Sequence, residues 1–410
     1  MRACGIVAEF NPLHKGHEYI MNEARSLSDC DALVIAMSGD YVQRGEPAIT
    51  DKWDRTRSAL SSGADLVIEI PTLFCLGNAG QYAGAGVRLL EALACTETIY
   101  CGSESGNSKV LKKLAGLLKS DKYDIENRIR TLIKTGISYP AARECAVMDI
   151  LSLNGESASD IREISDVLHN SNDILTLEYL MAAESADVYA LKRKGASYND
   201  EFKEGIEYQS ASGIRELLYE GSAGSIERAM SAISPESYQY IDFNKLTFPG
   251  DWTEALRYAL MITDAEDIED CPSGGEGLGH ALKEAAVNCS TRKEIINSVK
   301  SRRYTYTRIS RLCMQLVLRI RRRDYPFESP EYVRVLGFNK NGRELLSYIK
   351  KKDMSKLPIR TNINKESEYL GSSAKKMMEL DVSAADIYNL ISGRSIREYS
   401  DRVVGPVIAK

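Results

Sequence analysis

Two histidines stand on either side of a lysine and a glycine near the start of the chain, as His14, Lys15, Gly16 and His17. Imidazole N–H groups are good donors to an oxygen that gains charge during phosphoryl or nucleotidyl transfer. Residues three apart in a helix face the same side, so both rings can face one ligand, and the glycine lets that ligand approach the backbone. Alone, the pattern also fits a chance pair that binds a metal or nothing.

The elements around these residues favour an anion site. Residues 3–10 form an apolar run that predicts a buried strand, and residues 17–27 have helical spacing. The histidines therefore lie where a strand turns into a helix. A helix N-terminus offers free N–H groups and the positive end of the helix dipole, both of which suit phosphate.

The first two hundred residues alternate between expected strands and helices. Apolar runs predict further strands at 31–39, 64–71, 96–104 and 187–195. Amphipathic stretches predict helices at 51–63 and 78–93. The pattern predicts an α/β fold, with a Rossmann-like parallel sheet covered on both faces. Ligands bind at the carboxyl ends of such strands. Four segments should therefore share one crevice: 11–17, 38–46, 71–78 and 101–107.

The second half of the chain is mainly helical in pattern. We place a first domain, with the sheet and the anion site, at 1–220 and a mainly helical domain at 221–410. Ser212 and Gly221 are expected to bound a capped helix. Downstream of it the pattern predicts helices at 251–262, 279–300, 304–320 and 341–353, a strand at 332–338, and a mobile acidic, Gly-rich loop at 264–278.

Residues 300–323 concentrate positive charge, with Lys300 and eight arginines in 24 residues. The whole chain has a net charge of −5, so this density favours an anion such as the RNA backbone. Tyrosine and arginine can also stack on unpaired bases. The residues expected to contact tRNA are Arg302, Arg303, Tyr304, Arg308 and Arg311. A solvated helix face is the alternative interpretation.

The bulk composition narrows the class of protein. A length of 410 residues predicts at least two domains, and 43% hydrophobic residues can fill sizeable cores. No apolar run is long enough for a membrane helix or a secretory signal, so a cytoplasmic location is expected. The nine cysteines contain no CxxC, and with four histidines they give no zinc spacing. Reduced thiols and no protein-bound metal are expected.

Residues 5–20 resemble the HIGH-type motif of nucleotidylyltransferases and class I aminoacyl-tRNA synthetases. A second motif of that superfamily, a Ser-rich turn that ends in Ile-Arg, is similar to residues 210–215. A helix start with one arginine, Arg215, would form a second anion clamp for the departing phosphates. An ordinary surface arginine remains the alternative for Arg215.

Several further segments resemble one narrower family, the bacterial tRNA(Met) cytidine acetate ligases. The order and spacing of these segments both agree with the family, strongly over about the first 215 residues and more weakly beyond. The segments that carry the resemblance are 37–53, 100–104, 171–180, 191–200 and 301–312.

The resemblance implies an ATP site and catalytic residues. The implied catalytic residues are His14, Lys15, His17 and Arg215. The residues implied to bind ATP are Val7, Ala8, Glu9, Phe10, Asn11, Pro12, Leu13, His14, Gly16, His17, Ile20, Gly102, Ser103, Asn172, Arg193 and Ser212. The sequence departs from the family's pattern at Asp40, Ser171 and Asp173, where Asn, Pro and Asn are usual, and in a shorter spacing from Asn172 to Arg193.

The resemblance also implies an activity in two steps. Acetate attacks the α-phosphate of ATP, with Mg²⁺ on the phosphates, and gives acetyl-adenylate. The amine of a cytidine in the anticodon of elongator tRNA(Met) then takes the acetyl group. Ser38, Gly39 and Gln43 are candidates to line the acetate pocket, and a plain turn explains them equally well. Arg44 and Glu46 are compatible with a surface ion pair.

Two other functions remain open on the residues alone. One is a nucleotidylyltransferase that adenylylates a small phosphorylated metabolite, although such an enzyme needs no long helical half with a basic helix. The other is a noncatalytic RNA-binding protein with a vestigial nucleotide site, which the complete His14–His17 motif disfavours. No protein partner is indicated.

Overall fold

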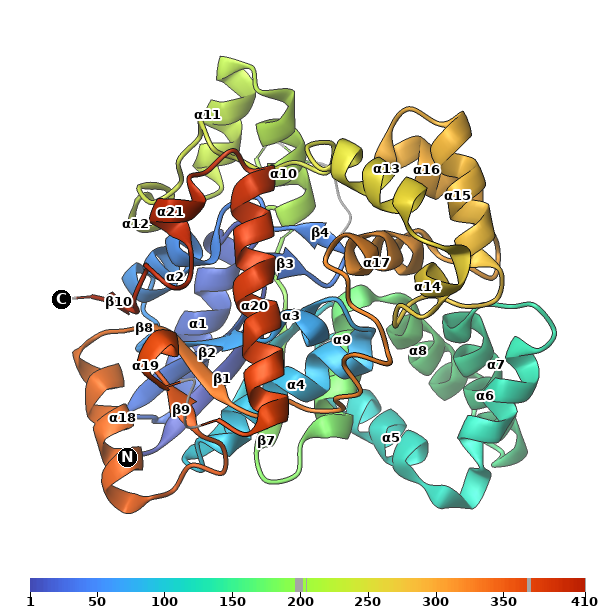
Figure 1. Cartoon of the computed structure of the whole chain (residues 1–410). Coiled ribbons are helices and arrows are strands. Elements are labelled where there is room, and N and C mark those ends of the chain that lie inside the picture. Colours follow the sequence, from blue (N-terminus) through green and yellow to red (C-terminus); the bar gives the residue numbers. More distant parts are fainter. Residues whose placement is uncertain (196–201, 204, 367–369, 410) are drawn as a thin grey trace.

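The computed structural model describes residues 1–195, 202–203, 205–366 and 370–409. In these ranges one eight-stranded sheet forms the centre of the molecule, in the order β10-β8-β5-β2-β1-β6-β7 with β9 beside β8 (Figure 1). Its strands are β1 (Ala3–Ala8), β2 (Ala32–Ser38), β5 (Leu66–Ile70), β6 (Thr96–Ser103), β7 (Asp187–Lys192), β8 (Val333–Phe338), β9 (Ile359–Arg360) and β10 (Val407–Ile408).

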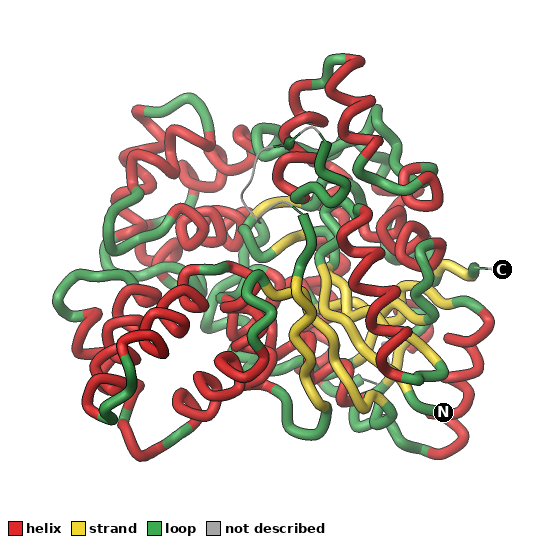
Figure 2. The backbone as a smooth tube through the Cα atoms, turned by 180° about the vertical axis from the view of Figure 1, so that it is seen from behind, coloured by secondary structure: helices red, strands yellow, loops and turns green. Residues whose placement is uncertain are grey.

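The five strands expected before residue 195 are confirmed, and they pair in parallel. Both faces are covered, which explains why β1, β2 and β5 are buried along their whole length. On β1, Ile6 packs with α1 (Lys15–Ser28) and α2 (Lys52–Ser61), while Val7 packs toward α3 (Thr72–Cys75) and α4 (Ala79–Ala92). Figure 2 shows the strands between these helical layers.

A helical lobe connects β6 to β7 beside the sheet (Figures 1 and 2). It consists of α5 (Ser108–Lys119), the 3₁₀ turn η1 (Asp121–Tyr123), α6 (Ile125–Ile133), α7 (Tyr139–Leu153), α8 (Ala158–His169) and α9 (Ser171–Ala182). α9 packs against α4 and β6 and so joins the lobe to the sheet. Across the described ranges, the model contains no helix with the length and apolar character that crossing a membrane requires.

A second helical region follows β7. It consists of α10 (Ala211–Glu220), α11 (Ala223–Ser231), α12 (Pro235–Tyr238), α13 (Thr253–Ile262), α14 (Ala265–Glu269), α15 (Leu278–Asn288), α16 (Arg292–Val299) and α17 (Tyr306–Val317). The single helix expected at 279–300 is wrong, because a capping box of Thr291 and Glu294 begins a new helix. The loop expected at 264–278 contains α14, whose Ile268 is buried.

The last eighty residues return to the sheet. β8 pairs antiparallel with β5, and β9 and β10 both pair with β8. The helices of this part of the chain are α18 (Lys340–Lys352), α19 (Ile363–Glu366), α20 (Ser372–Ile391) and α21 (Ile396–Tyr399). The sheet therefore contains strands from both sides of residue 220, the boundary expected between the two domains. The strand at 332–338 was expected in the helical domain, but its hydrogen bonds to β5 place it in the sheet with the strands of the first domain.

A buried cluster of charges holds this C-terminal segment in place. Lys52 Nζ lies 2.8 Å from Glu69 and 2.6 Å from Asp401, and Arg334 lies 2.9 Å from Glu69 and 2.6 Å from Asp401. Each of these side chains is at most 4% exposed. Burial alone would lower the pKa of Lys52, but Asp401 and Glu69 raise it, so the amine stays charged. The charges therefore compensate one another in a dry interior.

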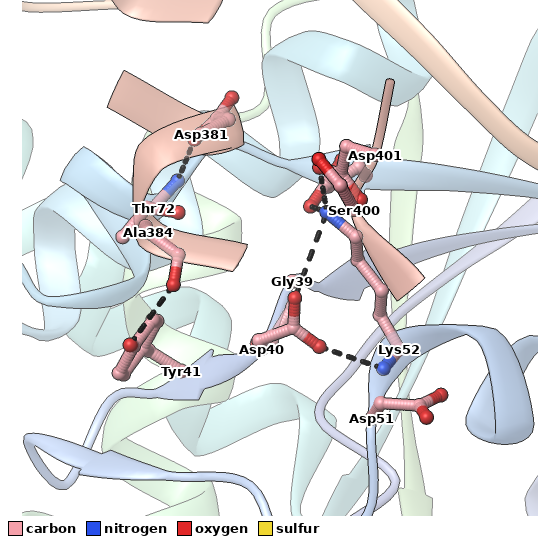
Figure 3. Close-up of polar contacts among 12 residues, drawn as sticks. Gly39, Asp40, Tyr41, Asp51, Lys52, Thr72, Asp381, Ala384, Ser400 and Asp401 are labelled. Carbon is pink, nitrogen blue, oxygen red and sulfur yellow. Dashed lines mark hydrogen bonds and ion pairs between the residues drawn. The ribbon is translucent and has the colours of Figure 1, made fainter. Parts of the chain in front are cut away.

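Neighbouring contacts join the same segments (Figure 3). Asp40 accepts a 2.8 Å hydrogen bond from the Lys52 amide, Thr72 N donates to Asp381 of α20 at 2.7 Å, and the Tyr41 hydroxyl donates to the Ala384 carbonyl at 3.0 Å. The last two bonds connect the segments that follow β5 and β2 to α20. The C-terminal segment therefore covers one end of the sheet.

Replacing Arg334 by leucine should strongly destabilise the protein. The change leaves Glu69 and Asp401 buried with Lys52 as their remaining cation, and removing one partner of a buried ion pair costs about 3–5 kcal/mol. Urea unfolding of Arg334→Leu against the wild type measures the change. Arg343→Leu, at an exposed position of α18, is the matched control. Equal unfolding midpoints for the two variants would contradict a stabilising role for the cluster.

Candidate active site

A cavity opens at the carboxyl ends of β1 and β6, beside the starts of α1, α9 and α10. Most residues that the sequence assigned to ATP lie around it. They are Val7, Ala8, Glu9, Phe10, Asn11, His14, Gly16, His17, Ile20, Gly102, Asn172, Arg193 and Ser212, together with Arg215. Residues from five separate parts of the chain thus meet at one place. Their individual roles toward ATP stay predictions.

Four expected residues lie outside the lining of this cavity: Pro12, Leu13, Lys15 and Ser103. Leu13 is 1% exposed and packs in the core beside Phe10. Ser103 is fully buried and donates a hydrogen bond to Asp173. Lys15 begins α1, and its amide donates to the Ala232 carbonyl at 3.1 Å. The structure therefore does not place the Lys15 ammonium at the cavity wall.

Of the segments expected in the crevice, 71–78 is covered by other elements, and 38–46 reaches the cavity only through Gln43. Residues 71–78 do not line the cavity, because Thr72 is bonded to α20 and the Leu76 carbonyl accepts from Gln315 of α17. Of the acetate candidates, Gln43 lines the cavity and Ser38 and Gly39 do not. A Cβ on Gly39 would lie 2.5 Å from Glu69 Oε1, so the buried carboxylate accounts for this glycine.

The two histidines cap α1. His14 is the N-cap residue, and its Nδ1 accepts from the Gly16 amide at 3.1 Å, while His17 Nδ1 accepts from the His14 amide at 3.4 Å. Their rings lie 3.8 Å apart, centroid to centroid. Since both Nδ1 atoms are acceptors, a neutral ring carries its proton on Nε2.

The surroundings keep both imidazoles neutral. Burial, with Arg193 nearby, lowers the pKa of His17 to about 3, and burial also holds the pKa of His14 well below its usual range. Nε2 of His14 is buried and has no hydrogen-bond partner in the described part of the chain. A buried donor of this kind calls for a ligand acceptor. Both rings can thus donate to an anionic oxygen without adding charge.

Arg215 closes the cavity from α10. Its guanidinium donates to the Asn11 carbonyl at 2.7 Å and to Ser212 Oγ at 3.3 Å. Ser212 was expected to begin this helix, but Ser210 is the N-cap, with its hydroxyl accepting from the Gly213 amide at 2.9 Å. Ser212 lies in the first turn instead, where it orients Arg215. Arg215 is half-buried and lines the cavity, and its role toward the phosphates stays a prediction.

Arg193 faces the histidines from the strand that ends opposite them. It follows β7, and its amide donates to the Ser103 carbonyl at 2.9 Å. A Cβ on Gly102 would lie 3.2 Å from Arg193 Cγ, so glycine leaves room for the side chain. Lys194 adds a second cation over the Tyr19 ring at 4.2 Å. Together with Arg215, these side chains make the cavity suitable for polyphosphate.

The start of α9 is held by acidic residues. Asn172 lines the cavity and donates to Glu104 at 2.7 Å through its side-chain amide. Asp173, where the family usually has Asn, is fully buried and accepts from Ser103, Ser105 and Asn170. This departure supports the turn after β6 and does not touch the cavity.

Asp40, another departure from the family pattern, belongs to the buried charge cluster. It does not line the cavity, and its carboxylate accepts from the Lys52 amide. Burial raises the pKa of Asp40 to about 6, with Lys52 opposing that rise. Its effect on the site is therefore indirect, through the position of the segment that follows β2.

The basic segment is partly neutralised by the acidic segment that precedes it. Arg303 pairs with Glu276 at 2.7 Å, Arg323 pairs with Asp267 at 2.7 Å, and Arg308 donates to the Ser273 carbonyl at 3.1 Å. Arg311 reaches the Gln43 carbonyl at 3.3 Å, and burial lowers its pKa to about 10. Arg302 is exposed and forms no ion pair with any described residue. The expected helix is also shorter, since α17 begins at Tyr306.

Several residues around the cavity were not expected. Tyr82, Leu175, Tyr179, Lys194 and Gln209 line it, as do Ile6, Tyr19, Met21 and Ala211. The sequence could have indicated Tyr19, because it follows His17 by two residues on α1. Tyr82 and Tyr179 come from α4 and α9, which look like ordinary core helices in the sequence.

Comparisons with known proteins agree with this geometry. The HIGH Nucleotidyl Transferase family model matches residues 1–402. A tRNA(Met) cytidine acetate ligase of Clostridium perfringens (strain SM101 / Type A) is 33% identical over 417 residues, covering 100% of both chains. The crystal structure of Thermotoga maritima TmcAL (apo, form I) is 30% identical with a TM-score of 0.90, covering 100% of this chain and 99% of that one. The form bound with alpha-thio ATP is 28% identical with a TM-score of 0.88 and the same coverage.

The neutral histidines predict a pH dependence of stability. Their folded-state pKa values lie below the 6.5 of a free histidine. The stability is therefore fully present above about pH 6.5 and falls as the pH drops toward 3, because the unfolded chain binds the protons. At pH 5.5, His17 alone should contribute roughly 1 kcal/mol of this loss.

Urea unfolding at pH 7.5 and 5.5 measures this loss for the wild type and for His17→Gln. We expect the variant to lose less stability than the wild type between the two pH values. His169→Gln, at an exposed position on α8, is the matched control. An equal loss in the wild type and in His17→Gln would show that the ring is not held neutral.

Proposed function

The chain belongs to the tRNA(Met) cytidine acetate ligase family within the HIGH nucleotidyl transferases, and we propose that it activates acetate with ATP and acetylates N4 of the anticodon wobble cytidine of elongator tRNA(Met). The observation that carries the proposal is the pair of neutral histidines at the start of α1, in one cavity with Arg193 and Arg215. The Thermotoga relative with alpha-thio ATP supports ATP as the nucleotide.

The first step needs positioned charge and no general base. A carboxylate oxygen of acetate attacks the α-phosphorus, and the bond from that phosphorus to pyrophosphate breaks, with the electron pair leaving on pyrophosphate. Acetate is already a nucleophile at neutral pH. The Nε2–H groups of His14 and His17 can donate to oxygens that gain charge in the transition state, and Arg193 and Arg215 can neutralise the phosphates.

The second step is acyl transfer. The amine N4 of cytidine attacks the acetyl carbonyl carbon, the new C–N bond forms, and the carbonyl C–O bond to AMP breaks. AMP leaves with the electron pair, and one N4 proton passes to solvent. Orientation of the two substrates is the main demand on the protein, because a fixed geometry removes most of the entropic barrier.

Mg²⁺ is part of the proposal as a companion of the ATP phosphates. Among the residues that the structure describes, no group of three or more His, Cys, Asp or Glu side chains could hold a metal ion. Glu9 is the carboxylate in the cavity lining, and its Oε1 already accepts from the Gln43 amide at 2.8 Å. Mg²⁺ would therefore arrive with ATP, near Glu9, and would neutralise phosphate charge.

The tRNA side of the proposal rests on the second helical region. Arg302 is exposed and forms no ion pair with any described residue, so it is available to contact the RNA backbone. Arg303 and Arg308 are engaged with the acidic segment, and Tyr304 stacks with both. A tRNA substrate places the enzyme in the cytoplasm.

The proposed activity can be measured directly. Purified protein should release pyrophosphate from ATP in the presence of acetate, and nucleoside mass spectrometry should detect N4-acetylcytidine in bacterial tRNA after the reaction. Propionate and an acetate-free reaction are the substrate controls. Pyrophosphate release that ignores acetate and depends on a phosphorylated metabolite would instead establish the adenylylating alternative.

Replacing His17 by alanine should separate catalysis from binding. Loss of one donor to a developing oxyanion costs about 10²–10³ in kcat. We expect acetate-dependent ATP–pyrophosphate exchange to fall by that factor while the affinity for tRNA stays within about twofold, because His17 lies in the nucleotide cavity. His169→Ala is the matched control. Normal exchange combined with lost tRNA affinity would refute the assigned role.

A further inference from the structure

A second cavity adjoins the nucleotide cavity on the far side of Arg215. It has a volume of about 770 Å³, and Asn11, Ser212 and Arg215 line both cavities. Its other walls are α10, the hairpin of β3 (Tyr41–Val42) and β4 (Glu46–Pro47), residues 247–253, and the starts of α16 and α17. We call it the α10 cleft. Figure 1 shows α10, β4 and α17 around this region.

One face of α10 connects the two cavities. Ser212, Arg215, Glu216 and Tyr219 follow helical spacing and all line the α10 cleft. Tyr219 lies seven positions after Ser212, which is a rise of about 10 Å along the helix axis. That length is comparable to one nucleotide. A ligand at Tyr219 can therefore reach the place where the two cavities meet.

The outer end of the α10 cleft carries an aromatic pair. Tyr219 is 68% exposed, and its ring meets the Phe248 ring edge-on at 5.2 Å between centroids. An exposed aromatic pair at the mouth of a cavity suits a base, because unpaired bases stack on such rings. Most of the Tyr219 surface faces solvent, so the ring has free area on which a base can stack.

The wall opposite α10 is polar and rigid. Arg292 is 2% exposed, lies 3.0 Å from Glu46 and 4.7 Å from the centroid of Trp252, and its Nε has no partner among the described residues. Lys293 beside it is exposed and unpaired within the described ranges. Cations on this wall and aromatic rings on the other give the two kinds of contact that a nucleotide needs.

We propose that the α10 cleft holds the acceptor nucleotide, an unpaired pyrimidine nucleotide of an RNA loop. A neighbouring base of the loop stacks at Tyr219 and Phe248, and the backbone lies toward Lys293. The acceptor base lies deeper in the cleft, so that its exocyclic amine reaches the acyl-adenylate past Asn11 and Arg215. The inference rests on the proposed function and extends it by assigning the second substrate to its own site. Tyr306 lines the cleft and belongs to the basic segment 300–323, so RNA bound in the cleft also lies beside that segment.

Tyr219→Ala tests the proposal, because the side chain is exposed and its loss leaves the core intact. Two measurements are needed: acetate-dependent ATP–pyrophosphate exchange, and fluorescence anisotropy of a labelled RNA stem-loop with CAU in its loop. Loss of one base–aromatic stack should weaken RNA binding roughly tenfold and leave the exchange within about twofold. Tyr219→Phe keeps the ring and should restore the affinity. Tyr258→Ala removes an equally exposed tyrosine, 66% exposed, outside the cleft and is the matched control.

Two outcomes would overturn the proposal. If Tyr219→Ala binds the stem-loop as Tyr258→Ala does, the cleft does not hold the acceptor. If the exchange falls as much as the RNA affinity, the cleft belongs to the first step. A wild type without acetate-dependent exchange would refute the proposed function alone, because the stem-loop affinities of the variants still decide where the RNA loop binds.

Discussion

The compensation of buried charge around Lys52 and Arg334 is the constraint on which the rest of the structure depends. Two cations and the carboxylates of Glu69 and Asp401 lie in a dry interior, where each is tolerable only because the others are present. The cluster fixes the segment between β2 and α2 through Asp40 and Lys52. From there the chain of contacts continues to the active site: the Ile49 amide donates to Asn11 at 2.7 Å, and Asn11 accepts from Arg215.

The active site itself uses neutral donors in a cationic cavity. A protonated imidazole between two arginines would be costly, and burial with Arg193 prevents it. The helix start provides the backbone amides, the Nδ1 acceptors fix the rings, and Nε2–H remains for the ligand. Under the proposed function, the arginines would neutralise polyphosphate, while the histidines would donate directed hydrogen bonds. This division of labour explains why one turn of helix holds two histidines rather than two lysines.

Much of the positive charge that looks free in the sequence is already engaged in the fold. The acidic residues at 264–278 and the arginines at 303–323 are neighbours in space, and they form ion pairs and carbonyl contacts with each other. Electrostatic attraction for RNA is thereby concentrated on fewer exposed residues, such as Arg302 and Lys293. An aromatic and cationic cleft beside the nucleotide cavity is a more specific feature for a single-stranded loop than a uniformly basic helix face.

The sequence by itself determined the local elements and the main anion site. Periodicity gave all five parallel strands of the N-terminal half, and the HKGH residues at a strand–helix junction identified the cavity, because these properties depend on neighbours in the chain. Tertiary structure alone decided the rest. β8 joins the sheet through hydrogen bonds to β5, some 265 residues away in the chain, and no local pattern encodes such a partner. Residues 71–78 are held away from the cavity by contacts with α17 and α20, and Ser103 is bonded to Asp173 of α9. Lys15 begins α1 outside the cavity lining, and Tyr82, Tyr179 and the α10 cleft arise where distant helices meet. Long-range packing and charge compensation choose these positions, and neither is visible in a stretch of sequence read alone.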